Sequence, residues 1–397
     1  MSTMNANLTA TAAPIPTKEE LVARARDLIP LLRERAPEDE KNRKINPDTI
    51  RRMVDGGLFR ILQAKRWGGY ELGQQAFAEV QIALAEGDMS VAWVYGVVGL
   101  HAMHLCLLDD RAAQDVWGED NSLLIASPYM PGGKAIPVDG GYRLTGRWSY
   151  SSGSDHCPWT FLGGMVEGTG EYLSFLLPRE DAKIDDTWFT TGLCATGSQD
   201  IVVNDAFVPA YRTHSFLEGF NGKNPGAQWN NSTLFRMPFM LVFMRAITSG
   251  QIGALQAMAD LFTEYAKNKM FMGSKTSKDP DAQFALANAV AGIDEMKKSM
   301  FANFDVMQEY AERDELPPIE MRHMFRFQSS SVAERCIRLA EPLFQVSSGG
   351  GVYDKTNIGR IYRNMLTGRQ HAAAQLRPYG RTFGDLLMGG EPFDMML

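Results

Sequence analysis

The sequence of 397 residues has few cysteines, and its four cysteines lie far apart. Cys106, Cys157, Cys194 and Cys336 form no C-x-x-C pair. A zinc site and a disulfide framework both require cysteines at short, regular spacings. The spacing therefore argues against both kinds of site and predicts a protein of the reducing cytoplasm.

Positive charge is also scarce. The formal net charge is −7 at pH 7, and no run of Lys and Arg is interleaved with aromatic residues. Because nucleic-acid binding requires many cationic contacts with phosphates, we exclude that class of partner. The first residues lack the basic and apolar regions of a signal peptide. Residues 1–16 are predicted to form a flexible tail.

One segment lacks charged residues altogether. Val91–Leu108 contains no Lys, Arg, Asp or Glu. Its length is at the lower limit for a membrane-spanning helix, but it contains two histidines and is flanked by Asp88 and Asp109. The pattern favours a buried helix of a globular protein, and we predict no membrane association.

The common nucleotide-binding, hydrolase and metalloprotease motifs are absent. The sequence has no GxGxxG, GxxxxGK[ST], GxSxG or HExxH pattern, so Rossmann, P-loop and related readings lose their main support. His101 and His104 are three residues apart and could share a helix face, but no nearby carboxylate completes a metal site. We predict no metal, and we expect His104 to be a buried histidine with partners inside the protein.

What the sequence does contain is a clear order of three regions, which predicts an α+β protein. Helical periodicity dominates residues 17–118. It begins with a single amphipathic helix predicted over Thr17–Arg35, where Thr17 and Glu20 have the spacing of a capping box. Short alternating runs between glycines and prolines predict a β-barrel or sandwich in residues 119–225. Long helical patterns joined by short loops predict an antiparallel bundle in residues 226–397.

Hydroxyl groups between large aromatic rings mark a first candidate site. The segment RWSYSSGSDHCPW places Ser151 and Ser152 directly after Trp148 and Tyr150, at the end of a predicted strand. By themselves these residues fit either the wall of a cofactor site or an ordinary polar strand end.

A glycine turn followed by basic residues marks a second candidate site. Ser347–Arg381 contains Gly350 and Gly351, which would let backbone N–H groups approach a ligand closely. Arg369 and several other cations follow, and no Asp or Glu occurs from Lys355 to Gly384. This pattern suits a phosphate-bearing cofactor, and a basic subunit interface explains it equally well.

These motifs together resemble a known family over nearly the whole chain. They are, in chain order, RWGGYELG, WSYSSGSDH, TTGLCATGSQDIVVNDAFVPAYR, and a glycine turn followed by GRIYRN. The arrangement resembles the acyl-CoA dehydrogenase fold from about residue 17 to residue 397. Within that fold, the W-x-x-SSG-x-DH pattern and the GEPFDMML tail are most similar to two-component flavin monooxygenases that hydroxylate phenols. Examples are p-hydroxyphenylacetate 3-hydroxylase and the secosteroid phenol hydroxylases.

The resemblance implies a cofactor and partners. Reduced FMN or FAD would arrive from a separate flavin reductase, react with O₂ to give a flavin 4a-hydroperoxide, and transfer oxygen to an aromatic substrate. The chain would form a homotetramer. Ser151 and Ser152 would belong to a cofactor wall, with Ser152 bonding near a flavin nitrogen. Uncharged walls of Trp93, Trp148 and Tyr150 would keep water away.

The resemblance also implies catalytic roles. His101 matches the family histidine that contacts the phenol, and it would accept or share the phenolic proton. Ser127 matches a serine that partners the same phenol. His371 matches a family histidine near the flavin.

The substrate is expected to be a phenol or polycyclic aromatic with a large apolar part. Met240 stands where p-hydroxyphenylacetate 3-hydroxylase has an arginine, which argues against a small carboxylated phenol. Phe239 and Met240 belong to Leu234–Arg245, whose Phe and Met side chains could line a broad apolar pocket. Plain core packing is the alternative for any one of them.

An acyl-CoA dehydrogenase or oxidase is the alternative function. Those enzymes need a carboxylate base, and the matching position here is Ala372, eight residues past Asn364. Some relatives carry the base on another helix, so this function stays open. A flavin-free scaffold protein is a third possibility, which the intact SSGSDH and SSGGG segments disfavour.

Overall fold

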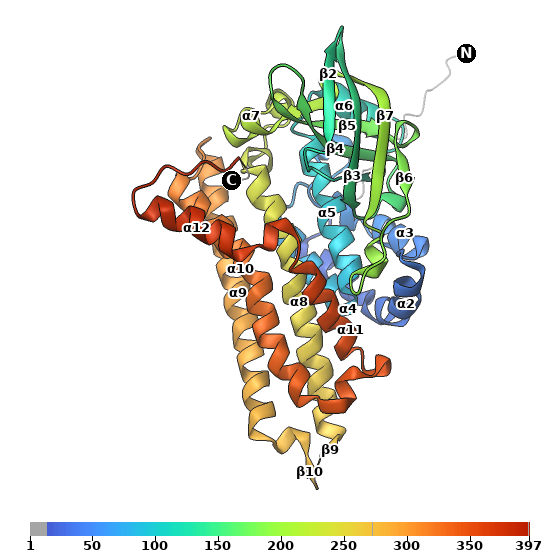
Figure 1. Cartoon of the computed structure of the whole chain (residues 1–397), viewed down its shortest axis with the longest axis vertical. Coiled ribbons are helices and arrows are strands. Elements are labelled where there is room, and N and C mark those ends of the chain that lie inside the picture. The colour runs from blue at the N-terminus through green and yellow to red at the C-terminus, as the bar shows by residue number, and fades with distance from the viewer. Residues whose placement is uncertain (1–13, 272, 396) are drawn as a thin grey trace, which may run out of the picture.

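A computed structural model describes residues 14–271, 273–395 and 397. A twisted sheet lies beside the upper end of a bundle of long helices, and α5 runs between the two (Figure 1). The predicted tail lies outside the described residues up to residue 13. The predicted order of helices, strands and helices is confirmed.

Six α-helices precede the sheet. They are α1 (Lys18–Asp27), α2 (Ile29–Asn42), α3 (Pro47–Asp55), α4 (Gln74–Gly87), α5 (Met89–Leu105) and α6 (Asp110–Trp117). The predicted capping box of Thr17 and Glu20 is present at the start of α1. The single helix expected over residues 17–35 is instead two, because Pro30 has no N–H to donate and stands in the first turn of α2.

The uncharged segment forms the central helix of the molecule. Every residue of α5 is buried, and the helix packs against α4, α8 and the sheet. Burial on all sides explains why the segment has no charged residue. Among the described residues, no helix is long and apolar enough to span a bilayer.

The middle region is one eight-stranded mixed sheet with its own small core. Its strands are β1 (Ile125–Ala126), β2 (Gly133–Val138), β3 (Gly141–Ser151), β4 (Trp159–Val166), β5 (Tyr172–Pro178), β6 (Lys183–Asp185), β7 (Gln199–Pro209) and β8 (Thr213–Ser215). The order is β6-β7-β3-β2-β4-β5-β8, with β1 beside β4. The β1 pairing brings Ile125 and Ala126 against α5.

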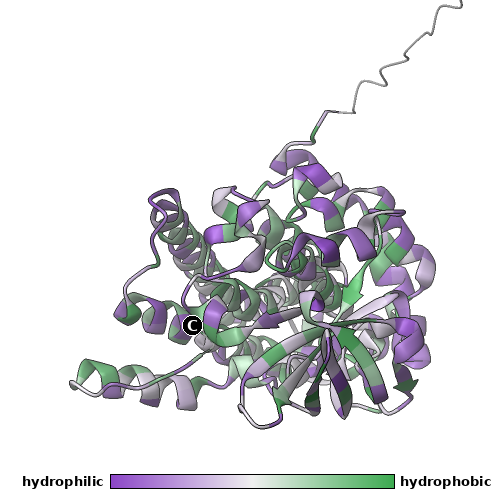
Figure 2. Ribbon diagram, turned by 90° about the horizontal axis from the view of Figure 1, so that it is seen from above, coloured by the Kyte–Doolittle hydropathy of each residue, from purple (hydrophilic) through white to green (hydrophobic). Residues whose placement is uncertain are grey.

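The C-terminal region is a helical bundle. After the short α7 (Phe216–Phe220) come α8 (Phe239–Asn268), α9 (Pro280–Glu312), α10 (Ile319–Val346), α11 (Ile358–Gly368) and α12 (Leu376–Leu387). A small hairpin, β9 (Met270–Phe271) with β10 (Ser274–Lys275), joins α8 to α9. Seen from above, the helices carry both hydrophilic and hydrophobic residues, as expected for helices that each bury one face (Figure 2).

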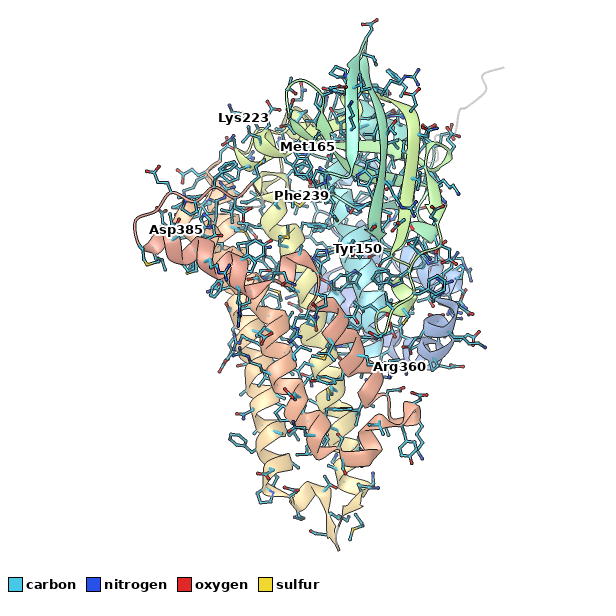
Figure 3. All side chains as sticks on the ribbon, in the orientation of Figure 1. Tyr150, Met165, Lys223, Phe239, Arg360 and Asp385 are labelled. Carbon is cyan, nitrogen blue, oxygen red and sulfur yellow. The ribbon has the colours of Figure 1, made fainter. Side chains whose placement is uncertain are left out.

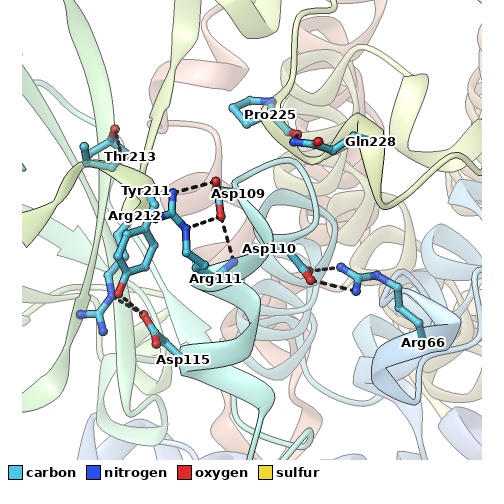
Figure 4. A network of polar contacts seen from close by, with 11 residues as sticks. Arg66, Asp109, Asp110, Arg111, Asp115, Tyr211, Arg212, Thr213, Pro225 and Gln228 are labelled. Atoms are coloured by element: carbon cyan, nitrogen blue, oxygen red, sulfur yellow. Dashed lines mark hydrogen bonds and ion pairs between the residues drawn. The ribbon is translucent and has the colours of Figure 1, made fainter.

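Ion pairs on α6 join the N-terminal helices to the end of the sheet (Figure 4). Asp115 accepts from Arg212 Nε at 2.7 Å and from the Tyr211 hydroxyl at 2.9 Å. Asp110 pairs with Arg66, whose Nε also donates to Asn230 at 2.9 Å. Asp115 thereby holds the segment between β7 and β8 against α6, and Arg66 links α6 to the loop after α7.

Candidate functional site

A chain of hydroxyl groups lies where α5, the sheet and α11 meet. Trp93 Nε1 on α5 donates to Ser152 Oγ at 3.1 Å. Ser152 Oγ lies 2.7 Å from Ser198 Oγ, which lies 2.7 Å from Thr196 Oγ1. Thr196 Oγ1 donates to the Leu193 carbonyl at 2.8 Å. We call Trp93, Ser152, Ser198 and Thr196 the serine cluster.

The direction of these hydrogen bonds follows from counting protons. The single hydroxyl proton of Thr196 goes to Leu193, so Thr196 accepts from Ser198, and Ser198 in turn accepts from Ser152. Ser152 also accepts from Trp93. What remains at Ser152 Oγ is one lone pair, so this side chain is ready to accept a hydrogen bond from a ligand N–H.

A tight turn holds Ser152 in place. Gly153 has φ +72°, and a Cβ there would lie 2.8 Å from Val94, so only glycine fits between the turn and α5. The Gly153 N–H donates to the Thr196 carbonyl at 2.8 Å. The loop that carries Thr196 is tied to α11 because the Leu193 N–H donates to Asn364 Oδ1 at 2.8 Å.

His371 completes this end of the site. Its ring packs edge-on against Trp93, with the ring centroids 5.6 Å apart. Nδ1 accepts from the Ala373 N–H at 3.0 Å, which leaves Nε2 to carry the proton of the neutral ring. Burial, together with the nearby Arg326 guanidinium, lowers the pKa of His371 to about 4.

His101 lies about two turns further along α5, in an aromatic cage. The ring is fully buried. Its centroid lies 5.6 to 6.3 Å from the ring centroids of Tyr129, Phe161 and Phe243, which form the cage. Its Nδ1 lies 2.6 Å from the Ile125 carbonyl, which fixes Nδ1 as the donor. Nε2 is buried, has no hydrogen-bond partner in the described part of the chain, and therefore presents an unused lone pair.

The two ends of the site are set by one helix. Trp93 and His101 are eight residues apart on α5, which corresponds to about 12 Å along the axis. Burial lowers the pKa of His101 to about 4, so the imidazole is neutral near pH 7 and able to accept a proton.

His104 behaves as predicted for a buried histidine with internal partners. Its Nδ1 lies 2.5 Å from the Tyr129 hydroxyl and its Nε2 lies 3.0 Å from His214 Nδ1. No group of three or more metal-ligating side chains occurs in the described part of the chain.

The predicted substrate residues Ser127, Phe239 and Met240 are all buried. Ser127 is buried and directly follows β1, whose Ile125 holds His101. Phe239 begins α8 and stacks on His104 at 4.5 Å rather than on His101. Met240 is also buried. Both α8 side chains belong to the hydrophobic core, as the alternative of plain core packing has it.

The other residues predicted for the cofactor wall lie at the end of β3. Ser151 is fully buried, and no described residue forms a hydrogen bond with its hydroxyl. Tyr150 has a left-handed φ of 71° and is 58% exposed. It lies on the side of the sheet nearest the helices, packed edge-on against Trp188 (Figure 3).

The prediction that Trp148 lines the same wall is wrong. Trp148 is 1% exposed and belongs to the separate core inside the sheet. Its Nε1 donates to the Gly163 carbonyl at 2.6 Å. Residues two apart on a regular strand share a face, so the prediction placed Trp148 beside Tyr150. The pairing of β3 is irregular between Trp148 and Ser151, and the side chains after this point no longer share the face of Trp148.

This placement predicts that Trp148 matters for stability. Trp148→Ala is expected to lower the free energy of unfolding by about 3–5 kcal/mol, because it removes a large buried ring and leaves a cavity. Urea denaturation measures this change. Trp229→Ala is the control, since Trp229 is 38% exposed, and its effect should stay within about 0.5 kcal/mol. A small effect at Trp148 would contradict its assignment to the core.

The glycine turn lies at the other end of α11 from His371. Gly350 and Gly351 belong to a 3-10 segment, Ser348–Val352. A Cβ at Gly350 would lie 2.1 Å from the Tyr265 hydroxyl, so this glycine permits a packing contact within the chain. Arg369, at the end of α11, pairs with Glu334 at 3.3 Å. Within one chain, the glycine turn and the serine cluster lie at opposite ends of α11, whereas Arg369 directly follows Gly368, which packs against Trp93.

Sequence reasoning missed four side chains that complete the site. Ser198 and Thr196 extend the serine cluster, and Tyr129 and His214 each bond directly to His104. Thr196 and Ser198 do occur in the TGSQD stretch, whose small polar residues before a strand were the available signal. Tyr129 and His214 carried no such signal, because they are far from His104 in the sequence and meet it only in the folded protein.

A carboxylate base is missing where an acyl-CoA dehydrogenase would need one. The buried portion of α8 contains no Asp or Glu before Asp260. Position 364 is Asn rather than Asp, and its side chain anchors the loop at Leu193. The aromatic cage around His101 instead contains an imidazole whose Nε2 has no hydrogen-bond partner among the described residues.

Comparison with known proteins agrees with this geometry. The C-terminal domain family of acyl-CoA dehydrogenases matches residues 246–376. The chain is 36% identical over 354 residues to a flavin-dependent monooxygenase, oxygenase subunit HsaA, from Rhodococcus jostii, covering 87% of this chain and 92% of that protein. The corresponding protein of Mycobacterium tuberculosis is 33% identical, with 96% and 98% covered.

Solved structures show the same likeness. The 3-HSA hydroxylase from Rhodococcus sp. RHA1 superposes with a TM-score of 0.91 at 33% identity, covering 95% of this chain and 99% of that one. With identity above 30% over most of both chains, and with the fold and the serine cluster in place, the chain belongs to the family of oxygenase subunits of flavin-dependent monooxygenases that share the acyl-CoA dehydrogenase fold.

Proposed function

We propose that this protein uses reduced flavin, supplied by a separate reductase, and O₂ to hydroxylate a phenol with a large apolar part ortho to its hydroxyl group. The observation that carries the proposal is His101. Its unpaired Nε2 is buried in an aromatic cage, and a phenol hydroxyl placed there would find a proton acceptor. Removing the phenolic proton makes the ring more electron-rich, which favours attack on an oxygen donor.

The serine cluster fits the flavin. Reduced flavin carries N–H groups that the oxidised ring lacks, and the remaining capacity of Ser152 Oγ is to accept such a group. Trp93, Ser152 and His371 would hold the ring, with Tyr150 and Ser151 beside them. When bound, the reduced flavin supplies the electrons that activate O₂. The buried surroundings of Ser152 exclude water from this end of the site.

The roles of the more distant residues rest on assembly. Gly350, Gly351 and Arg369 would bind phosphate groups of FMN or FAD, with Ser127 acting on the phenol. Because the glycine turn is remote from the serine cluster of its own chain, Gly350 and Gly351 would serve a neighbouring subunit of a homotetramer in the cytoplasm. Light scattering on the purified protein tests the tetramer.

Isotope labelling tests the proposed reaction. Anaerobically reduced FMN or FAD is added to the protein and a phenol, and ¹⁸O₂ is then admitted. We expect one ¹⁸O atom in the product, located by mass spectrometry at the ortho carbon.

The matched pair 4-ethylphenol and 4-hydroxyphenylacetate tests the apolar substrate. We expect kcat/KM to be at least about tenfold higher for 4-ethylphenol, because burying an unpaired carboxylate costs well over 1.4 kcal/mol.

Two results would overturn the proposal. The first is the absence of ¹⁸O from every phenol, with oxidised flavin bleached by an acyl-CoA instead. That outcome would indicate the dehydrogenase alternative. The second is a preference for the carboxylated phenol, which would overturn the apolar substrate class while leaving the hydroxylation itself in place.

A further inference from the structure

His101 has a geometric limitation as a proton acceptor. A proton taken up at Nε2 cannot leave through Nδ1, because Nδ1 is held against the Ile125 carbonyl at 2.6 Å inside the protein. A carbonyl oxygen does not pass a proton on. The proton must therefore leave from the same side on which it arrived, and the site needs another route to solvent.

A continuous line of hydrogen bonds begins beside His101 and reaches the surface. The Tyr129 ring packs edge-on against His101 at 5.6 Å, and its hydroxyl lies 2.5 Å from His104 Nδ1. His104 Nε2 lies 3.0 Å from His214 Nδ1. His214 Nε2 lies 2.9 Å from Asn224 Oδ1, and Asn224 is partly exposed.

Every hydrogen bond in this line is donated in the same direction, from Tyr129 toward Asn224. Asn224 Oδ1 can only accept, so His214 Nε2 carries a proton and His214 Nδ1 accepts from His104. His104 Nδ1 must then accept from the Tyr129 hydroxyl. Each histidine therefore accepts through one nitrogen and donates through the other, which is the arrangement a proton shuttle requires.

We propose that Tyr129, His104, His214 and Asn224 form a proton relay between the phenol end of the active site and solvent. The relay rests on the proposed function, because that function creates the need to move a proton at His101. In the outward direction, Tyr129 passes its hydroxyl proton to His104 Nδ1 and accepts a replacement at oxygen. His104 passes its Nε2 proton to His214 Nδ1, and His214 passes its Nε2 proton to water beside Asn224.

The bonds balance in this sequence. Every O–H or N–H bond that breaks is matched by one that forms, no group is oxidised, and the reverse sequence admits a proton from solvent. The amide of Asn224 orients the outer N–H and does not itself carry the proton. A bound phenol or a water would connect the Tyr129 hydroxyl to His101, since Nε2 of His101 has no hydrogen-bond partner among the described residues.

The surroundings of His104 and His214 keep both rings neutral, which suits passing a proton on rather than holding it. The titratable side chains facing His104 are His101 on the same helix, Tyr129 after β1 and His214 on β8. Tyr172 on β5 donates to the Tyr129 carbonyl and does not join the line. Burial lowers the pKa of His214 to about 4 and that of His104 well below its usual value, so both rings are neutral between transfers.

The outer end is positioned by contacts that have no other evident use. The Gly226 N–H donates to the Leu107 carbonyl at 2.9 Å, and Asn230 Nδ2 donates to the Cys106 carbonyl at 2.8 Å. A Cβ at Gly226 would lie 2.0 Å from the Cys106 carbonyl oxygen, so only glycine allows this approach. These hydrogen bonds hold the loop that carries Asn224 against the end of α5, where Asn224 contacts His214.

A pH-jump experiment on the flavin-free, full-length protein tests the relay without turnover. 4-Nitrophenol is the probe, because its ionised form absorbs visible light. The protein with bound probe is mixed with buffer of a different pH in a stopped-flow instrument, and the rate of the absorbance change is recorded. A relay speeds this proton exchange but leaves its end point and the probe's Kd unchanged.

We compare three variants. Tyr129→Phe removes the inner hydroxyl, and His214→Gln can form hydrogen bonds but cannot pass a proton. Both are expected to slow the exchange at least tenfold, and His214→Gln, which changes a residue outside the aromatic cage, should keep Kd within twofold of wild type. Tyr172→Phe removes a neighbouring hydroxyl outside the relay and should exchange at the wild-type rate. The wild-type exchange must also exceed the probe's dissociation rate, measured by displacement with unlabelled phenol.

The outcomes separate the relay from the function on which it rests. Binding with equal exchange rates in all four proteins would overturn the relay alone. Slowing in Tyr172→Phe as large as in Tyr129→Phe would also overturn it, since a general loosening of the region would then explain the effect. Failure of the wild-type protein to bind 4-nitrophenol or any other phenol would overturn the proposed function, and the relay with it.

Discussion

Replacing His101 with asparagine is expected to lower kcat for phenol hydroxylation by about 100-fold or more, which is the usual contribution of a positioned general base. Nε2 of His101 is the buried, unpaired acceptor in the aromatic cage, and the shorter amide presents no comparable base there. Binding of reduced flavin should stay within about twofold, because His101 lies about two turns of α5 from the serine cluster. Single-turnover product formation and a separate flavin titration measure the two effects.

The pH profile adds an independent test of His101. Its pKa of about 4 lies below the ordinary 6.5 because burial penalises the imidazolium, so the neutral base persists from pH 8 down to about pH 5. We expect the wild-type rate to fall through protonation of His101 only as the pH approaches 4. A rate that falls with a midpoint near 6.5 would contradict this assignment.

A second buried histidine provides the control. His323 on α10 is 3% exposed and lies outside the aromatic cage. His323→Asn should leave kcat within about twofold of wild type. Equal losses in the two variants would show that burial of a histidine, rather than the position of His101, sets the rate.

Replacing Ser152 with alanine is expected to uncouple the reaction. The substitution removes the acceptor oriented by Trp93 and Ser198, at distances of 3.1 and 2.7 Å, and leaves the Trp93 N–H without its partner. Loss of a hydrogen bond in a buried site costs about 1.4 kcal/mol, which corresponds to about a tenfold change. We expect the ratio of hydroxylated phenol to hydrogen peroxide to fall by about tenfold, measured per reduced flavin consumed.

Two controls locate this effect. Ser330→Ala removes another buried serine, on α10, whose hydroxyl bonds only to the Phe327 carbonyl at 2.8 Å, and it should leave the ratio unchanged. Ser152→Thr keeps a hydroxyl and should recover part of the coupling. Full coupling in Ser152→Ala would show that the serine cluster is an ordinary polar strand end, the alternative that the sequence left open.

The order of the three regions could be predicted from the sequence because it depends on local patterns. Period-2 alternation places β3, β5 and β7, and long helical periodicity places α8, α9 and α10. The absence of charge from Val91–Leu108 predicted a helix buried on all sides, and α5 is buried at every residue. The main local error was the single N-terminal helix, where the effect of Pro30 was overlooked.

The candidate site was predictable only in part. Resemblance to a family pointed to His101 and Ser152, and both occupy buried positions where α5 meets other elements. Trp148 shows where a pattern of neighbouring aromatic residues misleads. Three residues before Ser151 on the same strand, its ring turns into the core of the sheet, because side-chain direction in a strand depends on register and on bulges.

By itself, then, the sequence determined the fold class, the buried central helix, and the residue types available for chemistry, because each of these follows from periodicity and composition. The tertiary structure alone decided which of those residues meet. Ser198, directly before β7, meets Ser152, directly after the paired strand β3. His214 and His104 form a hydrogen bond although they are 110 positions apart in the chain. Such contacts depend on how strands and helices pack, and packing brings together residues whose separation in sequence carries no signal of their proximity.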